Sequence, residues 1–277
     1  MLYKIGVTLI PDIGDISIKK LISYCGSAAE VFRRKRDQLL KIPGLGPHMA
    51  KQIMSSTVLH RAEKELKFIQ RHNITALFFT DYGYPEKLKH AIDGPALLFY
   101  RGTADLNAHR MVSVVGTRKP TQYGLHCCDT LIEQLKDCNV CIISGLAYGI
   151  DTRAHQRALE LGMPTIGVLA HSLDFIYPYA NRHLAKKIYA NGGLVTDYIS
   201  GTPPDRQNFP SRNRIVAGMA DAVIVIESGI KGGALITADI ANSYNRDVFA
   251  FPGKITDAMS LGCNKLINDH KAAIITA

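Results

Sequence analysis

The sequence predicts an α/β protein in which a small all-α domain precedes a mostly parallel sheet with helices on both faces. From residue 111 onward, short apolar runs alternate regularly with helix-length segments, which is typical of parallel strands that are buried on both faces. Before residue 67, two similar stretches containing proline and glycine recur, which indicates a duplicated unit. We therefore expect a helical domain over residues 1–66 and a sheet domain over residues 67–277.

Composition limits the classes of partner and location. The chain of 277 residues has a net charge of +9 and a pI of about 9.2, which fits a polyanionic partner. No apolar run approaches the ~20 residues that span a bilayer, and we expect neither a signal peptide nor membrane association. Six cysteines without a framework spacing indicate reduced thiols and a cytoplasmic protein. A lone CxxC, Cys138 to Cys141, lacks a second pair, so we expect no metal site.

The duplicated unit comprises Ile10-Pro11-Asp12-Ile13-Gly14 and, 32 residues later, Ile42-Pro43-Gly44-Leu45-Gly46. Such glycines before a helix resemble the helix-hairpin-helix motif of SAM-like domains, whose tight turn directs backbone N–H groups toward a phosphate. The second copy matches better, so Gly44, Gly46 and Lys51 are possible DNA contacts. In the first copy Asp12 replaces a glycine, and that hairpin can be purely structural. Tandem hairpins also serve as plain packing modules, and the sequence leaves this alternative open.

The sheet domain is expected to be an extended Rossmann-like fold. Two lead-in strands are expected over residues 74–79 and 96–100. Six further strands are expected over residues 111–115, 140–143, 165–169, 194–197, 223–226 and 248–251, with helix-length segments such as 123–136 between them. In a parallel sheet, ligands bind outside the carboxyl ends of the strands. The residues that follow each strand are therefore the candidate site.

Glycines, hydroxyls and cations follow these strands. The turn Gly116-Thr117-Arg118-Lys119 lies between a strand and a helix, where free N–H groups, the helix dipole and the fork of Arg118 favour an anion. Ser144-Gly145 and Lys231-Gly232-Gly233 follow two other strands. The segment 198–215, with Arg206, Arg212 and Arg214, is expected to be a long loop of functional importance.

The Gly-rich turns suggest phosphate binding, and the sequence contains no catalytic motif. It lacks the patterns GxxxxGK[ST], GxGxxG, GxSxG and HExxH. We interpret His155 and His171 as structural histidines, because a catalytic pair needs a specific geometry. Asp151 is expected to cap its helix. The pattern therefore favours binding over turnover.

Several loop segments together resemble the DNA-processing protein A family (DprA/Smf). The matching segments are VGTRKPTQYG at residues 115–124, SGLAYGID at 144–151 with His155, Tyr177-Pro178 with Asn181-Arg182, FPSRNRI at 209–215, GGALITA at 232–238 and FPG at 251–253. They occur in the family's order over residues 74–277, and the helical domain fits the family's usual amino-terminal domain. Many relatives carry a carboxyl-terminal winged helix, which we do not expect in this chain because it stops at Ala277.

The resemblance implies a protein that binds single-stranded DNA, dimerises and loads the RecA recombinase onto incoming strands during natural transformation. It implies neither enzymatic activity nor a cofactor. By motif position, the DNA-binding residues would be Gly116, Thr117, Arg118, Lys119, Ser144, Gly145, Arg212, Asn213, Arg214, Lys231, Gly232 and Gly233. Four aromatic residues are candidates for stacking on bases and equally for the core: Tyr148, Phe175, Tyr177 and Phe209.

The sequence leaves two rival hypotheses open. Nucleoside-phosphate hydrolases of the lysine-decarboxylase-like group share a Rossmann-type sheet with Gly-rich turns and a catalytic acid. Glu227 stands before Ser228-Gly229 here, but the PGGxGT turn of that group is missing. The second rival hypothesis is a purely structural protein that binds only other proteins.

Overall fold

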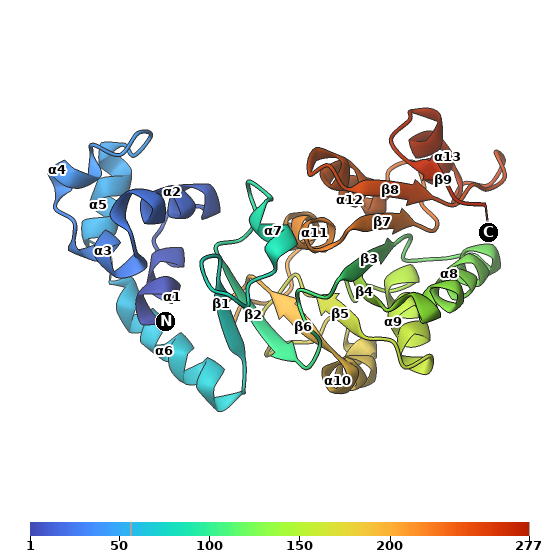
Figure 1. Cartoon of the computed structure of the whole chain (residues 1–277), viewed down its shortest axis with the longest axis horizontal. Coiled ribbons are helices and arrows are strands. Elements are labelled where there is room, and N and C mark those ends of the chain that lie inside the picture. The colour runs from blue at the N-terminus through green and yellow to red at the C-terminus, as the bar shows by residue number, and fades with distance from the viewer. Residues whose placement is uncertain (56, 277) are drawn as a thin grey trace.

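The computed structural model describes residues 1–55 and 57–276, and its amino-terminal part is entirely helical (Figure 1). The helices of this part are α1 (Leu2–Thr8), α2 (Asp15–Cys25), α3 (Ala28–Arg33), α4 (Arg36–Leu39), α5 (Pro47–Ser55) and α6 (Val58–Arg71). Helix α6 crosses the domain boundary expected at residue 66 and leads directly into the sheet.

In the remaining part of the chain that the structure describes, nine strands form one sheet in the order β1-β2-β6-β5-β4-β3-β7-β8-β9. The strands are β1 (Thr75–Phe78), β2 (Leu97–Gly102), β3 (Arg110–Val115), β4 (Val140–Ser144), β5 (Thr165–Val168), β6 (Gly192–Thr196), β7 (Ala222–Val225), β8 (Asp247–Ala250) and β9 (Ala273–Ile274). Only β1 with β2 and β2 with β6 pair antiparallel. The other pairs are parallel, which confirms the predicted α/β fold with a mostly parallel sheet.

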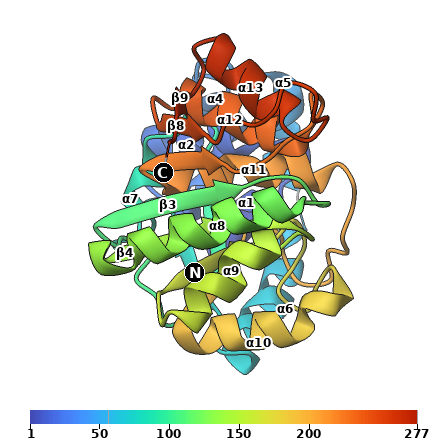
Figure 2. The same ribbon diagram turned by 90° about the vertical axis from the view of Figure 1, so that its right-hand side faces the viewer.

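Helices cover both faces of this sheet (Figure 2). Apolar side chains of α8 (Gln122–Leu135) and α9 (Ile150–Glu160) pack on one face, and α10 (Arg182–Asn191) lies beside α9. The other face is covered by α7 (Glu86–Lys89), α11 (Asn208–Met219), α12 (Gly233–Ser243) and α13 (Leu261–Asn268). Two single 3₁₀ turns, η1 (Lys136–Cys138) and η2 (Tyr179–Asn181), complete the elements.

One expectation about the segment after β6 is wrong. Residues 198–207 form a loop, but Asn208–Met219 is helix α11, so that Arg212 and Arg214 lie on a helix. Pro210 does not prevent this helix, because it stands in the first turn, where a backbone N–H has no intrahelical partner.

The two repeated hairpins share a left-handed residue at the corresponding position. Gly44 has a φ of 79°, and Asp12 at the corresponding position has a φ of 60°, because aspartate tolerates the left-handed region better than most residues do. The two copies face different surroundings. Lys19 of the first copy donates a hydrogen bond of 3.0 Å to the carbonyl of Ala91 in the sheet domain, whereas its counterpart Lys51 is exposed.

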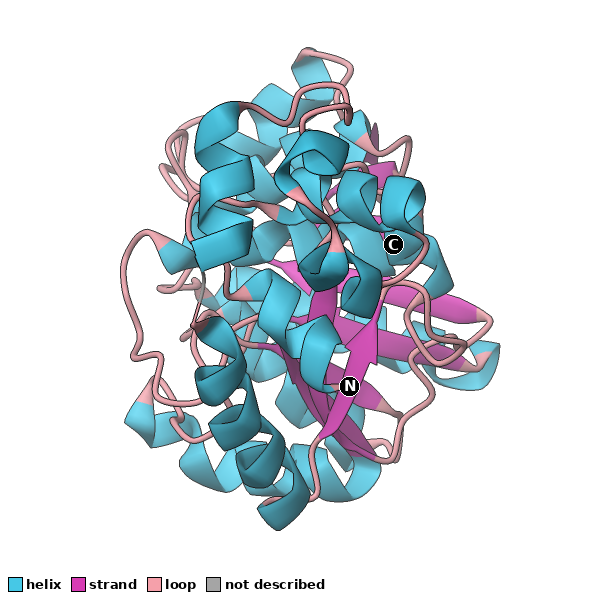
Figure 3. Ribbon diagram, turned by 90° about the vertical axis from the view of Figure 1, so that its left-hand side faces the viewer, coloured by secondary structure: helices cyan, strands magenta, loops and turns pink. Residues whose placement is uncertain are grey.

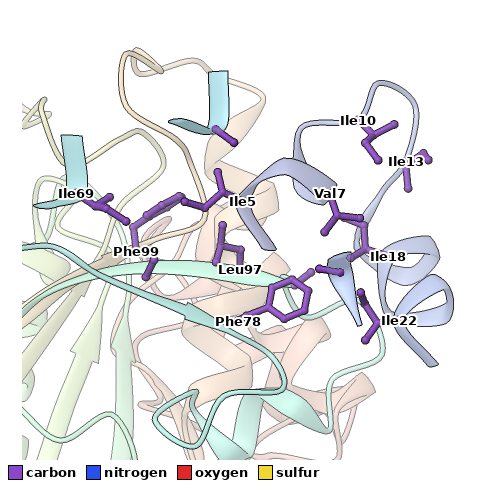
Figure 4. Packing of buried hydrophobic residues seen from close by; sticks show 14 of the residues in the cluster. Ile5, Val7, Ile10, Ile13, Ile18, Ile22, Ile69, Phe78, Leu97 and Phe99 are labelled. Atoms are coloured by element: carbon purple, nitrogen blue, oxygen red, sulfur yellow. The ribbon is translucent and has the colours of Figure 1, made fainter. Parts of the chain in front are cut away.

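The helical domain and the sheet domain share a hydrophobic core. Ile5 and Ile18 of the helical domain belong to the same buried cluster as Phe78, Leu97 and Phe99 of β1 and β2 (Figure 4). Seen from that side, the amino-terminal helices lie in front of the strands (Figure 3). Leu97 and Phe99 of β2 belong to this core, whereas Leu98 and Tyr100 belong to the core on the other face of the sheet. The helical domain therefore covers one face of β1 and β2, at the end of the sheet opposite β9.

Arg214 of α11 links the two domains electrostatically. Its guanidinium pairs with Asp15 of α2 at 3.0 Å and with Asp197 at 2.7 Å, and it also donates to the carbonyl oxygen of Asp93. Asp15 in turn accepts a hydrogen bond of 2.7 Å from the backbone N–H of Ala96. Since the guanidinium is mostly buried, its loss leaves two acids without their cation.

We expect Arg214→Met to lower the free energy of unfolding by about 3 kcal/mol, because breaking a buried ion pair leaves uncompensated charge. The matched control is Lys4→Met, which removes the more exposed interdomain pair of Lys4 with Asp81 and is expected to cost about 1 kcal/mol or less. Urea unfolding of both variants measures the difference. Equal destabilisation by the two substitutions contradicts the central role of Arg214.

Candidate functional site

The candidate site lies where the strand order of the sheet reverses. Strand β3 connects through α8 to its neighbour β4, whereas its other neighbour, β7, is reached only after β6. The helices that follow β3 and β7, α8 and α12, therefore lie on opposite faces of the sheet. At such a switch point a ligand crevice opens between the carboxyl ends of the two strands. A cavity of about 770 Å³ occupies this position.

The cavity brings together most of the predicted site residues. They come from the loops after β3, β4 and β7 and from two helices, and they are Gly116, Thr117, Arg118, Lys119, Gly145, Arg212, Asn213, Gly232 and Gly233. Thr117 donates its backbone N–H to the carbonyl oxygen of Glu227 at 2.7 Å. This bond ties the turn after β3 to the end of β7, so that the two glycine-containing turns face the same space.

Three predicted residues do not line the cavity. Ser144 is buried and donates its hydroxyl to the carbonyl oxygen of Val114 at 2.6 Å. Arg214 is held by the acids that link the two domains. Lys231 is exposed next to the loop glycines and lies outside the cavity lining. Sequence position alone could not separate these residues from their neighbours, because adjacent residues of a strand end or helix point in different directions.

An aromatic and cationic cluster forms one wall of the cavity. The Cζ atom of Arg118 lies 5.2 Å from the ring centroid of Phe209, and the ring of Tyr177 lies 5.8 Å from that of Phe209. Arg206, exposed in the loop before α11, also lines the cavity. The binding residues predicted from the sequence did not include Arg206. The only sequence feature that pointed to Arg206 was its place in the expected long loop. Of the four aromatic stacking candidates, Tyr177 and Phe209 line this cavity, while Tyr148 lines a separate one beside α8 and α9.

The floor of the cavity holds two buried, oppositely charged side chains. Asp151 and Arg212 are 7% and 4% exposed. Arg212 donates from Nη1 to the carbonyl oxygen of Val168 at 2.5 Å, and its pKa is lowered by burial, against the opposing effect of Asp151. Burial likewise raises the pKa of Asp151, although Arg212 acts in the opposite direction.

The expectation that Asp151 caps α9 is wrong. The capping position belongs to Gly149, which has a φ of 80° and no side chain to cap with. A Cβ at Gly149 would lie 2.3 Å from the carbonyl oxygen of Thr117, so only glycine fits there. Asp151 instead lies in the first turn of α9, and its Oδ2 accepts a long hydrogen bond of 3.3 Å from the N–H of Ala147.

Buried polar residues around the cavity are committed to structural hydrogen bonds. The carboxylate of Glu227 accepts from the N–H of Thr121 at 2.9 Å and from its hydroxyl at 2.6 Å, which holds the start of α8 against β7. His155 shares a hydrogen bond of 2.7 Å with the hydroxyl of Thr165. His171 lies 2.9 Å from the carbonyl oxygen of Ser172 and accepts from the N–H of Tyr177 at 3.3 Å.

The second hairpin forms a smaller, exposed site. A hollow of about 510 Å³ is lined by Arg36, Pro47, His48, Lys51, Met54 and Ser55. Gly44 and Gly46 are exposed beside it but do not line it. His48 pairs with Asp12 of the first hairpin at 3.1 Å. The hollow therefore combines two exposed cations with a turn that joins two short helices.

Comparison with known proteins identifies the family. The sequence model of the family described as DNA recombination-mediator protein A matches residues 75–277. DNA processing protein DprA of Streptococcus pneumoniae is 42% identical over 194 residues, which cover 70% of this chain and 68% of that protein. The chain belongs to this family. Protein Smf of a Synechocystis strain is 34% identical over 99% of this chain and 70% of its own length, so the resemblance noted from the loop segments is confirmed.

Solved structures of family members agree with the fold. The crystal structure of DprA from Streptococcus pneumoniae matches with a TM-score of 0.86 at 33% identity and covers 100% of this chain and 95% of that chain. DNA processing protein A from Helicobacter pylori, whose structure describes its single-stranded DNA binding mode, matches with a TM-score of 0.67 at 30% identity over 74% of this chain and 91% of that chain. In the part of the chain described here, no helix is long and apolar enough to cross a membrane.

We expect His155 to make the protein less stable in acid, because burial lowers its pKa in the folded protein to about 3. Between that value and the ordinary pKa near 6.5, only the unfolded chain binds the proton, so stability falls as the pH falls. Unfolding in urea at pH 7.5 and pH 5.0 measures the effect. In His155→Gln the decrease should be about 2 kcal/mol smaller than in wild type. An identical decrease in both proteins contradicts the assignment of this loss of stability in acid to His155.

Proposed function

We propose that the protein binds single-stranded DNA along the crevice at the carboxyl ends of β3 and β7. The observation that carries this proposal is the convergence of three kinds of group in one cavity. The start of α12 at Gly233 and the exposed cations Arg118, Lys119 and Arg206 suit phosphates. Phe209 and Tyr177 stand among these cations and suit bases. The single-stranded DNA binding mode of the Helicobacter pylori relative supports the same ligand.

Within this proposal, the protein is a scaffold that protects incoming DNA and loads RecA recombinase onto it during natural transformation. Membership of the DNA recombination-mediator protein A family supports this role. We further propose a cytoplasmic homodimer without a cofactor. Two protomers would then present two bound segments of one strand to the recombinase.

The hydrolase hypothesis is less well supported than binding. Its candidate acid, Glu227, is 1% exposed and accepts two hydrogen bonds from Thr121. A general acid or nucleophile must reach the substrate, and Glu227 does not line the cavity. We therefore propose a non-catalytic protein, and the absence of nucleoside monophosphate turnover at high protein concentration tests this part.

We expect Arg118→Ala to lower the affinity for a single-stranded oligonucleotide at least tenfold, because the residue contributes both a phosphate contact and a stacked cation. It should also reduce the slope of log affinity against log salt by about 0.7, the value for one phosphate contact on a single strand. Fluorescence anisotropy at several salt concentrations measures both. The control is Arg71→Ala, which removes an exposed arginine outside the cavity. Equal affinity in wild type and Arg118→Ala contradicts the proposed site.

We also propose that Gly44, Gly46 and Lys51 of the second hairpin hold another backbone phosphate. This contact should matter only for strands long enough to reach both sites. Lys51→Ala is therefore expected to reduce the salt slope by about 0.7 with a long oligonucleotide and to have no effect with a short one that fills only the cavity. Lys64→Ala on the exposed face of α6 is the matched control. No change for either length leaves the hairpin as a packing module.

A further inference from the structure

A groove of about 620 Å³ lies between the first turns of α8 and α9, outside the cavity of the proposed DNA site. Figure 2 shows these two helices side by side on one face of the sheet. Neighbouring residues of the same turn line the two hollows, because Lys119 lines the cavity and Pro120 lines the groove. Ala147 and Tyr148 are divided in the same way. A strand that crosses either turn therefore passes directly from the cavity into the α8–α9 groove.

Both turns have a fixed backbone. The N–H of Ile150 donates to the carbonyl oxygen of Thr117 at 3.2 Å, which ties the second turn to the first. The hydroxyl of Thr152 donates to the carbonyl oxygen of Ala147 at 2.6 Å. Leu146 is buried with a φ of 61°, a left-handed conformation that is rare for a bulky residue. Such strain persists only where the surrounding contacts enforce it, and it is common at ligand sites.

The ring of Tyr148 projects from this fixed backbone without a partner. The residue is 49% exposed. In the described part of the chain, its hydroxyl makes no hydrogen bond and its ring contacts neither another ring nor a cation. Tyr179, by comparison, is held by the guanidinium of Arg182, which donates to its hydroxyl at 2.8 Å. Because a tyrosine has few rotatable bonds, little conformational entropy is lost when the free ring of Tyr148 stacks on a ligand.

The walls of the groove suit a neutral group better than a phosphate. The carboxylate of Asp129 and the guanidinium of Arg153 form a bidentate pair at 2.5 and 2.6 Å, so that their charges offset each other. The exposed amides of Gln122 and Gln156 can each donate and accept hydrogen bonds, which matches the mixed polar edges of nucleobases. The exposed imidazole of His126 is another ring on which a base can stack.

We propose that the α8–α9 groove is a second base-binding subsite, in which Tyr148 stacks on a base of the strand that leaves the cavity over Lys119 and Pro120. The proposal rests on the proposed function and extends the path of the strand beyond the cavity. The exposed ammonium of Lys119 then holds the phosphate between the two subsites. Because every base has a π face, stacking on Tyr148 adds affinity without a sequence preference.

The absence of tryptophan from the chain provides a direct probe of this groove. Tyr148→Trp places a single indole there, and stacking on a base quenches indole fluorescence. Titration with a long thymine oligonucleotide should therefore cause a saturable loss of emission, at the concentrations where the anisotropy of a labelled strand rises. The matched control is Tyr82→Trp, which replaces a fully exposed tyrosine outside both hollows and should keep its emission.

Two further variants test the ring itself. Tyr148→Ala should lower the affinity for the long oligonucleotide about fivefold or more, which is the lower end of the contribution of one stacked base. Tyr148→Phe keeps the ring and should stay within about twofold of wild type. Neither variant should change the slope of log affinity against log salt, because stacking neutralises no phosphate. A short oligonucleotide that fills only the cavity should bind wild type and both variants equally.

Unquenched emission of Tyr148→Trp in complex with the long oligonucleotide overturns the subsite, even if Tyr148→Ala does not fold. Equal affinity of wild type and folded Tyr148→Ala for that oligonucleotide overturns it as well, and so does an equal loss in Tyr148→Ala and Tyr148→Phe. In each of these cases, loss of affinity in Arg118→Ala would leave the proposed function standing. Failure of wild type to bind either oligonucleotide is a failure of the proposed function instead.

Discussion

The site depends on one hydrogen bond between the two halves of the sheet, from the N–H of Thr117 to the carbonyl oxygen of Glu227 at 2.7 Å. It extends the parallel pairing of β3 and β7 beyond the last paired residues, Val115 and Val225. The carboxylate of Glu227 then holds Thr121 at the start of α8. One glutamate therefore fixes both the turn that carries Arg118 and the helix that follows it. The buried carboxylate of Glu227 makes these structural bonds and does not line the cavity. Backbone and cations form the surface that would face a phosphate.

Helix α11 connects this site to the amino-terminal domain. Phe209, Arg212 and Asn213 line the cavity, while Arg214 points to Asp15 and Asp197. Since neighbouring residues of a helix point in different directions, a single helix can present binding residues to the cavity and an anchoring residue to the other domain. The shared hydrophobic core holds the two domains in the same arrangement. The helical domain thus contributes to the placement of the site even where it makes no contact with the ligand.

The sequence predicted the fold and most of the cavity, and its errors have physical causes. Alternating apolar runs were sufficient to predict the parallel strands, and glycines at the strand ends indicated the turns that meet in the cavity. Local sequence does not reveal strand order, so the switch point between β3 and β7 needed the structure. The loop expected over 198–215 failed because Pro210 is compatible with a helix start, which also hid the different orientations of Arg212 and Arg214. The expected cap at Asp151 failed because Gly149 takes that position, and the packing of Arg212 and Asp151 against Gly145 depends on contacts between distant segments.

The central claim is that single-stranded DNA occupies the crevice between the ends of β3 and β7. The most direct test is photochemical cross-linking of an oligonucleotide that carries 5-iodouracil, followed by mass spectrometry of the modified peptides. Adducts on Phe209 or Tyr177, and their loss when unlabelled single strand competes, are the predicted result. Adducts confined to segments away from this cavity, with Phe209 and Tyr177 unmodified, would contradict the account.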